Sequence, residues 1–278
     1  MRPTVGLGFK ADYFEPALAC SAAGLWFEVH AENYMVAGGA RIAMLSAIRA
    51  SRPLSLHGVG LSLGGAAQPD AGHLQRLRAL VDRFEPFVVS EHLAWSRYQD
   101  TCFPDLLPFP RSHEALERIS TNIAMTQDAL GRQILVENPS LYIQLNGHEY
   151  DETEFLAELV CRTGCGLLVD VNNVYISANN MGYDARAYLD ALPHHAIGEI
   201  HLAGHTLDPE HGEALLIDSH DAPIADPVWA LFRYLVKHIG ERPTLIERDG
   251  NLPPFDELIA ERNHAAAIFE KLKERVDA

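Results

Sequence analysis

Carboxylate and imidazole side chains recur along this sequence at one kind of position, the end of a short apolar run. His57 ends residues 53–57 (Pro-Leu-Ser-Leu-His), and Glu137 ends residues 134–137 (Ile-Leu-Val-Glu). The residues of this kind are His57, His92, Glu137, Asp170, His201 and Glu247. Carboxylates and imidazoles packed together without cations would repel one another and lose solvation. The pattern therefore predicts bound divalent metal ions.

A segment after the seventh apolar run adds Asp218 and His220, which are separated by one residue. On an extended segment this spacing turns both side chains the same way. Taken alone, such a pair, or one histidine at a strand end, is explained as well by ordinary solvated or hydrogen-bonded side chains. Together with the residues above, the pair indicates a further metal position.

These side chains meet only if the runs that carry them are parallel strands. Eight apolar runs alternate with segments that have apolar residues at three- and four-residue steps, as in amphipathic helices. The runs are residues 5–9, 25–31, 54–59, 87–93, 134–138, 167–172, 197–203 and 244–248. The helical segments are residues 40–49, 72–84, 113–130, 152–162, 185–192, 228–239 and 255–276. The alternation predicts the α/β class and a single (β/α)8 TIM-barrel domain of residues 1–278, with the strand carboxyl ends at one mouth.

Strand alternation decides which side chains enter that mouth. It places Glu28, His30 and Glu32 on one face of their segment, and it turns the apolar neighbours of the polar residues outward to the helices. Those outward residues are Leu56, Val136, Val169, Ile200 and Ile246. The polar residues are then expected to converge inside the barrel mouth.

Composition excludes several classes of protein. The formal net charge is −16, from 38 acidic and 22 basic residues, which disfavours a nucleic-acid-binding surface. The four cysteines form no Cys-x-x-Cys pair and no disulfide-rich pattern, as in reduced cytosolic proteins. We find no secretory signal and no apolar run long enough to cross a membrane. The sequence therefore predicts a soluble, cytoplasmic protein.

The ordered set of polar residues resembles a known superfamily. His57, His92, Glu137, Asp170, Asn173, His201, Asp218, His220 and Glu247 are similar to the trinuclear metal sites of the xylose-isomerase-like and endonuclease IV-like TIM barrels. More closely, five segments resemble the multinuclear non-haem iron-dependent oxidases, a family that modifies cysteines in ribosomally made peptides. They are residues 27–34 (Phe-Glu-Val-His-Ala-Glu-Asn-Tyr), 90–95 (Ser-Glu-His-Leu-Ala-Trp), 136–139 (Val-Glu-Asn-Pro), 169–173 (Val-Asp-Val-Asn-Asn) and 218–221 (Asp-Ser-His-Asp). The resemblance extends over nearly the whole chain.

The resemblance implies a grouping of the ligands. One metal takes His57, His92 and Glu137. A second shares Glu137 and takes Asp170, His201 and Glu247. A third uses Asp218, His220 and Asn173, where the endonuclease pattern has histidine; Asn172 is the alternative ligand. Because an amide binds metals more weakly than imidazole, the third metal is expected to be loosely held.

Other polar residues are predicted to contact the ligands or the substrate, since a ligating imidazole usually needs an outer hydrogen-bond acceptor. They are Glu32, Asn33, Glu91, His205 and Arg248. The absence of cysteine from the set and its many carboxylates suit iron or manganese and permit zinc. The resemblance favours two to three irons, mixed-valent Fe(II)/Fe(III), with O2 as co-substrate.

The resemblance also implies the reaction and its partners. The expected activity is oxidation of cysteines in a precursor peptide, which gives a heterocycle, a thioamide or removal of the β-carbon. A separate partner protein that binds the peptide's leader is expected, and neither nucleic acid nor membrane. The alternatives are a phosphodiesterase like endonuclease IV or a sugar isomerase on the same barrel, and a non-catalytic metal-binding protein.

Two segments are predicted to be loops at the mouth that contact a peptide. Residues 58–65 are glycine-rich without a phosphate-binding lysine, which favours a mobile loop, and residues 95–110 contain several prolines. The histidines of the helical segments are predicted to be solvated. They include His73, His113, His238 and His264.

Overall fold

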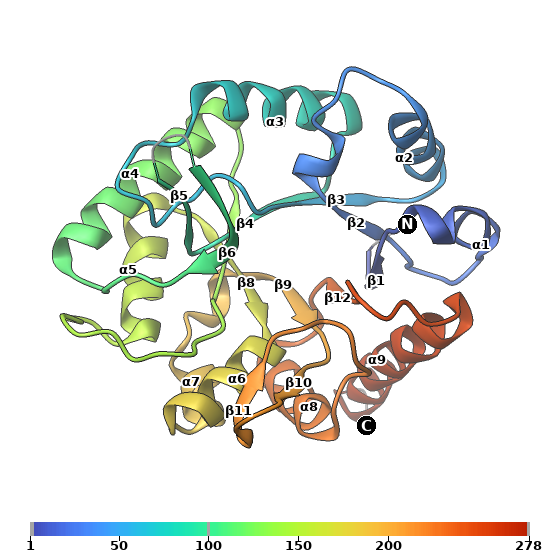
Figure 1. Ribbon diagram of the computed structural model, residues 1–278. Helices are drawn as coiled ribbons and strands as arrows, with labels where there is room; N and C mark the ends of the chain where they lie inside the picture. Colours follow the sequence, from blue (N-terminus) through green and yellow to red (C-terminus); the bar gives the residue numbers. More distant parts are fainter. Residues whose placement is uncertain (1–2, 99–100, 277–278) are drawn as a thin grey trace.

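The computed structural model describes residues 3–98 and 101–276. Within these residues, eight parallel strands close a barrel in the order β1-β12-β9-β8-β7-β4-β3-β2. Figure 1 shows the helices arranged around these strands. The barrel strands are β1 (Val5–Gly8), β2 (Phe27–His30), β3 (Leu54–Gly58), β4 (Val88–His92), β7 (Leu135–Glu137), β8 (Gly166–Asp170), β9 (Ile197–Leu202) and β12 (Thr244–Ile246). They correspond to the eight predicted apolar runs, so the predicted (β/α)8 barrel is confirmed.

The predicted helical segments also form helices, with ends that differ by at most two residues. The α-helices are α1 (Phe14–Ala19), α2 (Ala40–Ser51), α3 (Ala71–Phe84), α4 (His113–Leu130), α5 (Glu152–Thr163), α6 (Val171–Met181), α7 (Ala185–Ala191), α8 (Asp226–Ile239) and α9 (Phe255–Val276). Short 3-10 helices are η1 (Ala11–Tyr13), η2 (Ala31–Tyr34) and η3 (His194–Ala196). No described helix has the length and apolar character needed to cross a bilayer.

Helix α6 is absent from the sequence-based prediction, and the predicted strand 167–172 is too long. The strand ends at Asp170, whose carboxylate accepts the backbone N–H of Asn173 at 2.6 Å and so caps the first turn of the helix. Strand and helix therefore join without a loop. The asparagine-rich sequence of α6 has weak helix propensity and hid this boundary.

The two predicted mouth loops are more ordered than expected. Residues 95–98 and 101–107 form an antiparallel hairpin, β5 (Trp95–Tyr98) and β6 (Thr101–Leu107); positions 99–100 of the predicted loop lie outside the described residues. The segment 58–65 is not an open loop, because its residues 61–65 are buried. A second hairpin follows β9, formed by β10 (Thr206–Asp208) and β11 (Gly212–Ile217).

Two apolar layers support the strands. The outward-facing residues predicted from alternation all belong to the buried core between barrel and helices: Leu56, Val136, Val169, Ile200 and Ile246. Inside the barrel, the Trp26 side chain is completely buried. Because Trp26 precedes Glu28 by two residues, both side chains lie on the inward face of the chain. A Cβ atom on Gly6 would lie 2.4–2.8 Å from three atoms of the Trp26 ring. Gly6 therefore leaves the space that Trp26 fills.

We predict that Gly6→Ala destabilises the protein by about 1–3 kcal/mol, because the rigid, buried indole cannot give way to the added methyl group. Gly8→Ala is the matched control, since Gly8 lies on the same strand and a Cβ atom added there would have no neighbour within 4 Å. Urea unfolding of the two variants measures the difference. Equal free energies of unfolding would show that the indole does not fill this space tightly.

Candidate metal centre

His57, His92 and Glu137 form a compact group of ligand atoms. The Nε2 atoms of His57 and His92 lie 3.1 and 3.2 Å from Glu137 Oε2, and 3.3 Å from each other. Two ligand atoms bound at about 2.1 Å to one ion are separated by roughly 3.0–3.4 Å for tetrahedral or octahedral angles. The three side chains come from β3, β4 and β7, which are neighbours in the barrel. Their spacing fits a metal ion.

Both imidazoles of this group are oriented by their other nitrogen. His57 Nδ1 hydrogen-bonds to Ser90 Oγ at 2.7 Å, and His92 Nδ1 to the carbonyl oxygen of Gly58 at 3.0 Å. A ligating histidine usually makes such an outer bond, which fixes its tautomer and its ring plane. The Nε2 atoms are thereby left to face Glu137.

Glu137 also belongs to a second group. One ligand atom from each of Glu137, Asp170 and His201 lies within 4.8 Å of the others. Asn138 fixes Asp170 from the neighbouring strand, because its side chain accepts the Asp170 N–H at 2.9 Å and donates to the Asp170 carbonyl at 3.1 Å. Glu137 is therefore placed to serve two ions.

Glu247 lies between two histidines. Its Oε2 atom is 3.2 Å from His201 Nδ1 and 3.5 Å from His220 Nδ1. The other nitrogen of His220 lies 2.7 Å from Asp218 Oδ1. Asp170, His220 and Glu247 form a third group with ligand atoms within 4.8 Å. The predicted ligands of the second position are thus shared between two groups.

At the predicted third position, Asp218 and His220 lie together, with 2.7 Å between Asp218 Oδ1 and His220 Nε2. Asn172 donates to Asp218 at 3.0 Å and contacts His205 Nδ1 through its own oxygen at 2.9 Å. Asn173 lies by Glu137 instead and donates to the carbonyl of Asn138 at 3.1 Å. The two asparagines are consecutive residues in the first turn of α6, where successive side chains point about 100° apart, so they contact different groups.

Several buried polar atoms at these positions make no hydrogen bond within the described residues. They are Glu137 Oε2, Asp170 Oδ2, Asn173 Oδ1, both ring nitrogens of His201, and His220 Nε2. Unpaired buried polar atoms are costly. Since these atoms lie close together without hydrogen-bond geometry, the donor set fits divalent metal ions.

The pKa values of these side chains are shifted by their burial and by the neighbouring charges. Burial alone would raise the pKa of Glu137, but His92 and His57 outweigh it and lower that pKa to about 2. Burial alone would lower the pKa of His57, but Glu137 and Glu28 raise it to about 10. Burial, Asp218 and Glu137 raise the pKa of Asp170 well above its usual range. Without metal, His57 carries a proton at neutral pH.

The residues predicted to support the ligands lie in different places. Glu32 accepts hydrogen bonds from Val59 N and Gly60 N, and Glu91 accepts one from Leu61 N. Both carboxylates therefore hold the segment after β3 in place. His205 contacts Asn172, as described above. Asn33 lines a cavity of about 220 Å³ beside Glu28 and Glu247.

Two of the polar residues considered in the sequence point away from the centre. Arg248 forms an ion pair with Glu261 of α9 at 3.3 Å. The structure therefore does not bring it to the other predicted residues. His73 is buried and lies 3.3 Å from Glu32, which corrects its prediction as a solvated histidine.

Sequence reasoning missed Glu199, and it expected Glu28 and His30 at the mouth without giving them a role. His201 Nε2 lies 3.2 Å from Glu28 and 3.9 Å from Glu199, and His30 lies 3.7 Å from Glu247. Strand alternation offered the signal, since Glu199 precedes His201 by two residues. Glu32 does not share the face of Glu28 because β2 ends at His30.

A cavity of about 560 Å³ opens above these groups. His92, His220 and Glu247 line it, together with the β5–β6 hairpin and the segment after β7. Leu106, from the hairpin, and Ile143, from that segment, are exposed apolar side chains in its lining. The cavity therefore joins a polar, metal-ligating part to apolar walls.

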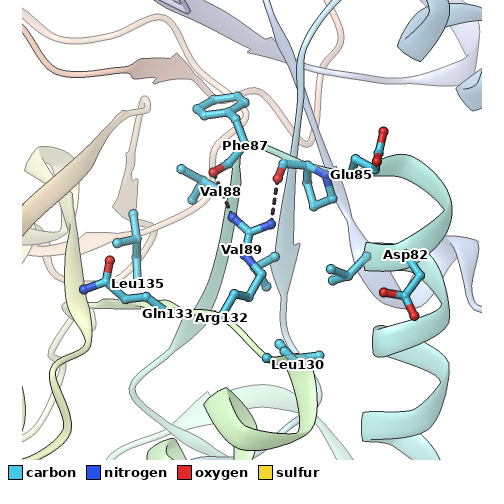
Figure 2. A pocket seen from close by; sticks show the side chains of 12 residues that line it. Asp82, Glu85, Phe87, Val88, Val89, Leu130, Arg132, Gln133 and Leu135 are labelled. Carbon is cyan, nitrogen blue, oxygen red and sulfur yellow. Dashed lines mark hydrogen bonds between the residues drawn. The ribbon is translucent and has the colours of Figure 1, made fainter.

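Another cavity, of about 480 Å³, lies at the opposite end of the barrel, beside the starts of β4 and β7 (Figure 2). Figure 2 shows the guanidinium of Arg132 pointing to the backbone just before β4, where it donates to the carbonyls of Pro86 and Phe87 at 2.7 and 2.8 Å. Arg132 therefore has a structural role, since it joins two segments of the fold. The candidate ligands line the cavity at the barrel mouth, so that cavity is the candidate site.

Solved structures with a similar fold come from the superfamily expected from the sequence. D-psicose 3-epimerase from Clostridium cellulolyticum H10 has a TM-score of 0.62 and 10% identity, over 97% of this chain and 99% of that one. Endonuclease IV from Thermus thermophilus has a TM-score of 0.56 and 16% identity, over 98% of this chain and 100% of that one. At such identities the likeness concerns the fold alone.

Curated relatives are much closer in sequence. A UPF0276 protein of Caulobacter vibrioides (strain NA1000 / CB15N) is 62% identical over 269 residues, 97% of this chain and 96% of the relative. A UPF0276 protein of Bordetella bronchiseptica is 51% identical over 267 residues, 96% and 92% of the two chains. The family model described as "RiPP precursor modification enzyme MbnB/TglH/ChrH" matches residues 4–270. The chain therefore belongs to this family of enzymes, which modify precursors of ribosomally made peptides.

Proposed function

We propose that this chain is a multinuclear iron-dependent oxidase that uses O2 to modify cysteine residues of a precursor peptide. The observation that carries the proposal is the position of Glu137, which belongs to two adjoining ligand groups below an open cavity. A carboxylate shared in this way supports a pair of neighbouring metals. Family membership supports a peptide substrate.

The ligand types support iron. The proposed ligands of the first two positions are His57, His92, Glu137, Asp170, His201 and Glu247. Asp218, His220 and an asparagine are proposed for a third. Nitrogen and oxygen ligands without cysteine suit iron or manganese better than a structural zinc. When bound, two to three irons in Fe(II) and Fe(III) states would supply the redox chemistry and the sites for O2 and a thiolate.

The protein's own part in the reaction is to bind, orient and exclude water. Ser90 and the Gly58 carbonyl orient the two imidazoles, and Asn138 orients Asp170. The apolar wall formed by Leu106, Tyr142 and Ile143 is suited to residues beside the reacting cysteine and limits water around it. Asn33, Glu32, Glu91 and His205 are proposed to act through the ligands or the mouth segments.

A partner protein is part of the proposal. The mouth cavity accommodates a short peptide segment, whereas selection of one precursor requires contacts far from the reacting atom. Because this chain has a net charge of −16, the partner or the leader peptide should carry a basic surface. Oxidation of the peptide and binding of the partner can be tested in one experiment.

The experiment uses anaerobically prepared iron protein and a cysteine-containing precursor peptide encoded beside its gene. We predict a mass change in the peptide that requires O2, is absent from the Cys→Ser peptide, and is absent with zinc, which has no redox chemistry. Mass spectrometry measures it with and without the product of the adjacent gene. Full turnover by the isolated chain would contradict the partner requirement. Absence of O2 uptake with the peptide, combined with nicking of abasic DNA or isomerisation of a sugar, would contradict the oxidase.

The shared position of Glu137 predicts which ions each ligand controls. Glu137→Gln should weaken binding of two ions, each by more than about 100-fold, because it removes a direct ligand rather than an outer contact. Asp218→Asn should weaken one, since Asp218 lies 2.7 Å from His220 and, among the described residues, forms no ion pair with another histidine of the centre. Elemental analysis and circular dichroism measure metal content and folding. Equal loss in both variants would refute the grouping.

Metal loading should depend on pH because a proton must leave His57. Its pKa of about 10 in the metal-free protein means that it is protonated at neutral pH, and a metal binds only the neutral nitrogen. Below that pKa, each released proton lowers the apparent affinity about tenfold for each unit by which the pH falls. Calorimetric titration in buffers of different protonation enthalpy measures the release. A pH-independent affinity would exclude it.

A further inference from the structure

His201 is oriented differently from the other two imidazoles of the centre. His57 and His92 turn Nε2 toward Glu137 and bond outward through Nδ1. In His201, Nδ1 is the atom near the other ligands, at 3.2 Å from Glu247 Oε2. Its Nε2 atom faces the barrel interior. The outer partner of His201 must therefore come from below the centre.

Glu28 occupies that place. Its Oε1 atom lies 3.2 Å from His201 Nε2, and the side chain is only 3% exposed. Its other oxygen accepts a hydrogen bond from Ser55 Oγ at 2.7 Å. Glu28 and Ser55 are register partners on the adjacent strands β2 and β3. One oxygen is thus held by the barrel, and the other is presented to the imidazole.

Glu199 lies on the same side of the ring and raises an alternative. Its carboxylate is completely buried and makes no hydrogen bond within the described residues, and one oxygen lies 3.9 Å from His201 Nε2. Glu28, Glu199 and His201 could together surround an additional cation. Glu28 lies closer to His201 Nε2 than Glu199 does, at 3.2 against 3.9 Å, and it is also held by Ser55. Glu28 is therefore the better placed outer acceptor, and the control below tests the extra cation.

We propose that Glu28, held by Ser55, is a positioning residue that accepts the Nε2–H of His201 and so directs Nδ1 to the metal shared by Glu137 and Asp170. Nε2 and Oε1 are close but not aligned as a hydrogen bond. The carboxylate sets the ring plane and makes Nδ1 a stronger donor to the metal. This inference rests on the proposed metal centre but not on iron or oxygen chemistry.

The test is titration of the metal-free protein with cobalt(II) against a competing chelator. Glu28→Gln keeps the shape of the side chain and removes its charge. We expect about 10- to 100-fold weaker binding at one position, the usual effect of losing an outer carboxylate, with the other positions unchanged. The d–d absorption of cobalt at that position should shift, because the donor strength of its imidazole changes. Ser55→Ala should cause a smaller loss at the same position.

Glu199→Gln is the matched control, because Glu199 is equally buried and faces the same ring without reaching it. Its cobalt affinity and spectrum should stay within about threefold of the parent protein, since it lacks the outer contact. Unchanged binding in Glu28→Gln would overturn the proposal. Loss of one whole cobalt equivalent in both variants would overturn it in favour of an additional cation.

The folding of each variant and the oxidase activity are tested independently of cobalt binding. Circular dichroism checks each variant, and Ser55→Ala tests the same contact if Glu28→Gln does not fold. An unchanged affinity and spectrum in folded Ser55→Ala would then count against the proposal. Cobalt binding does not report peptide oxidation, so a negative result here leaves the proposed oxidase intact. Conversely, a failed oxidation assay leaves the role of Glu28 to be decided by cobalt binding.

Discussion

The structure of the barrel mouth depends on the burial of Glu137 between two imidazoles. Its carboxylate is 2% exposed, and one of its oxygens lies within 3.2 Å of the Nε2 atoms of His57 and His92. Burial alone would make this charge unfavourable, so the side chain requires positive charge on the same oxygen. Protonated histidine supplies that charge in the metal-free protein, and metal ions would supply it more fully. The remaining proposed ligands lie around this carboxylate.

The fold meets the requirement through short, direct connections. Asp170 ends a strand and caps a helix with the same carboxylate, so its position is set by both elements. Asn138 adds two hydrogen bonds to the backbone of Asp170. Below the centre, Trp26 fills the barrel and Gly6 leaves the space for it. Strands therefore hold the proposed ligands His57, His92, Glu137, Asp170 and His201, whereas Glu247 follows the end of β12 and Asp218 and His220 follow β11.

Much of this arrangement was predictable because strand alternation and the barrel mouth leave few choices. They predicted that His57, His92, Glu137 and His201 point inward. Strand alternation does not apply where the backbone departs from a strand: Asn172 and Asn173 are in a helix, and Glu32 follows the end of β2 and bonds to the segment after β3. Glu199 was missed because only the residues at the strand ends were considered, although alternation places Glu199 on the same face of β9 as His201. Arg248 was placed by proximity in sequence, whereas its ion pair with Glu261 depends on the packing of α9.

The central claim is that Glu137 bridges two metal ions. Anomalous-scattering crystallography at the iron edge, on anaerobically prepared protein, tests it most directly. The account predicts one peak enclosed by His57, His92 and Glu137 and another enclosed by Glu137, Asp170 and His201, with Glu137 bound to both. A single peak, or peaks that leave Glu137 bound to one ion or none, would contradict it.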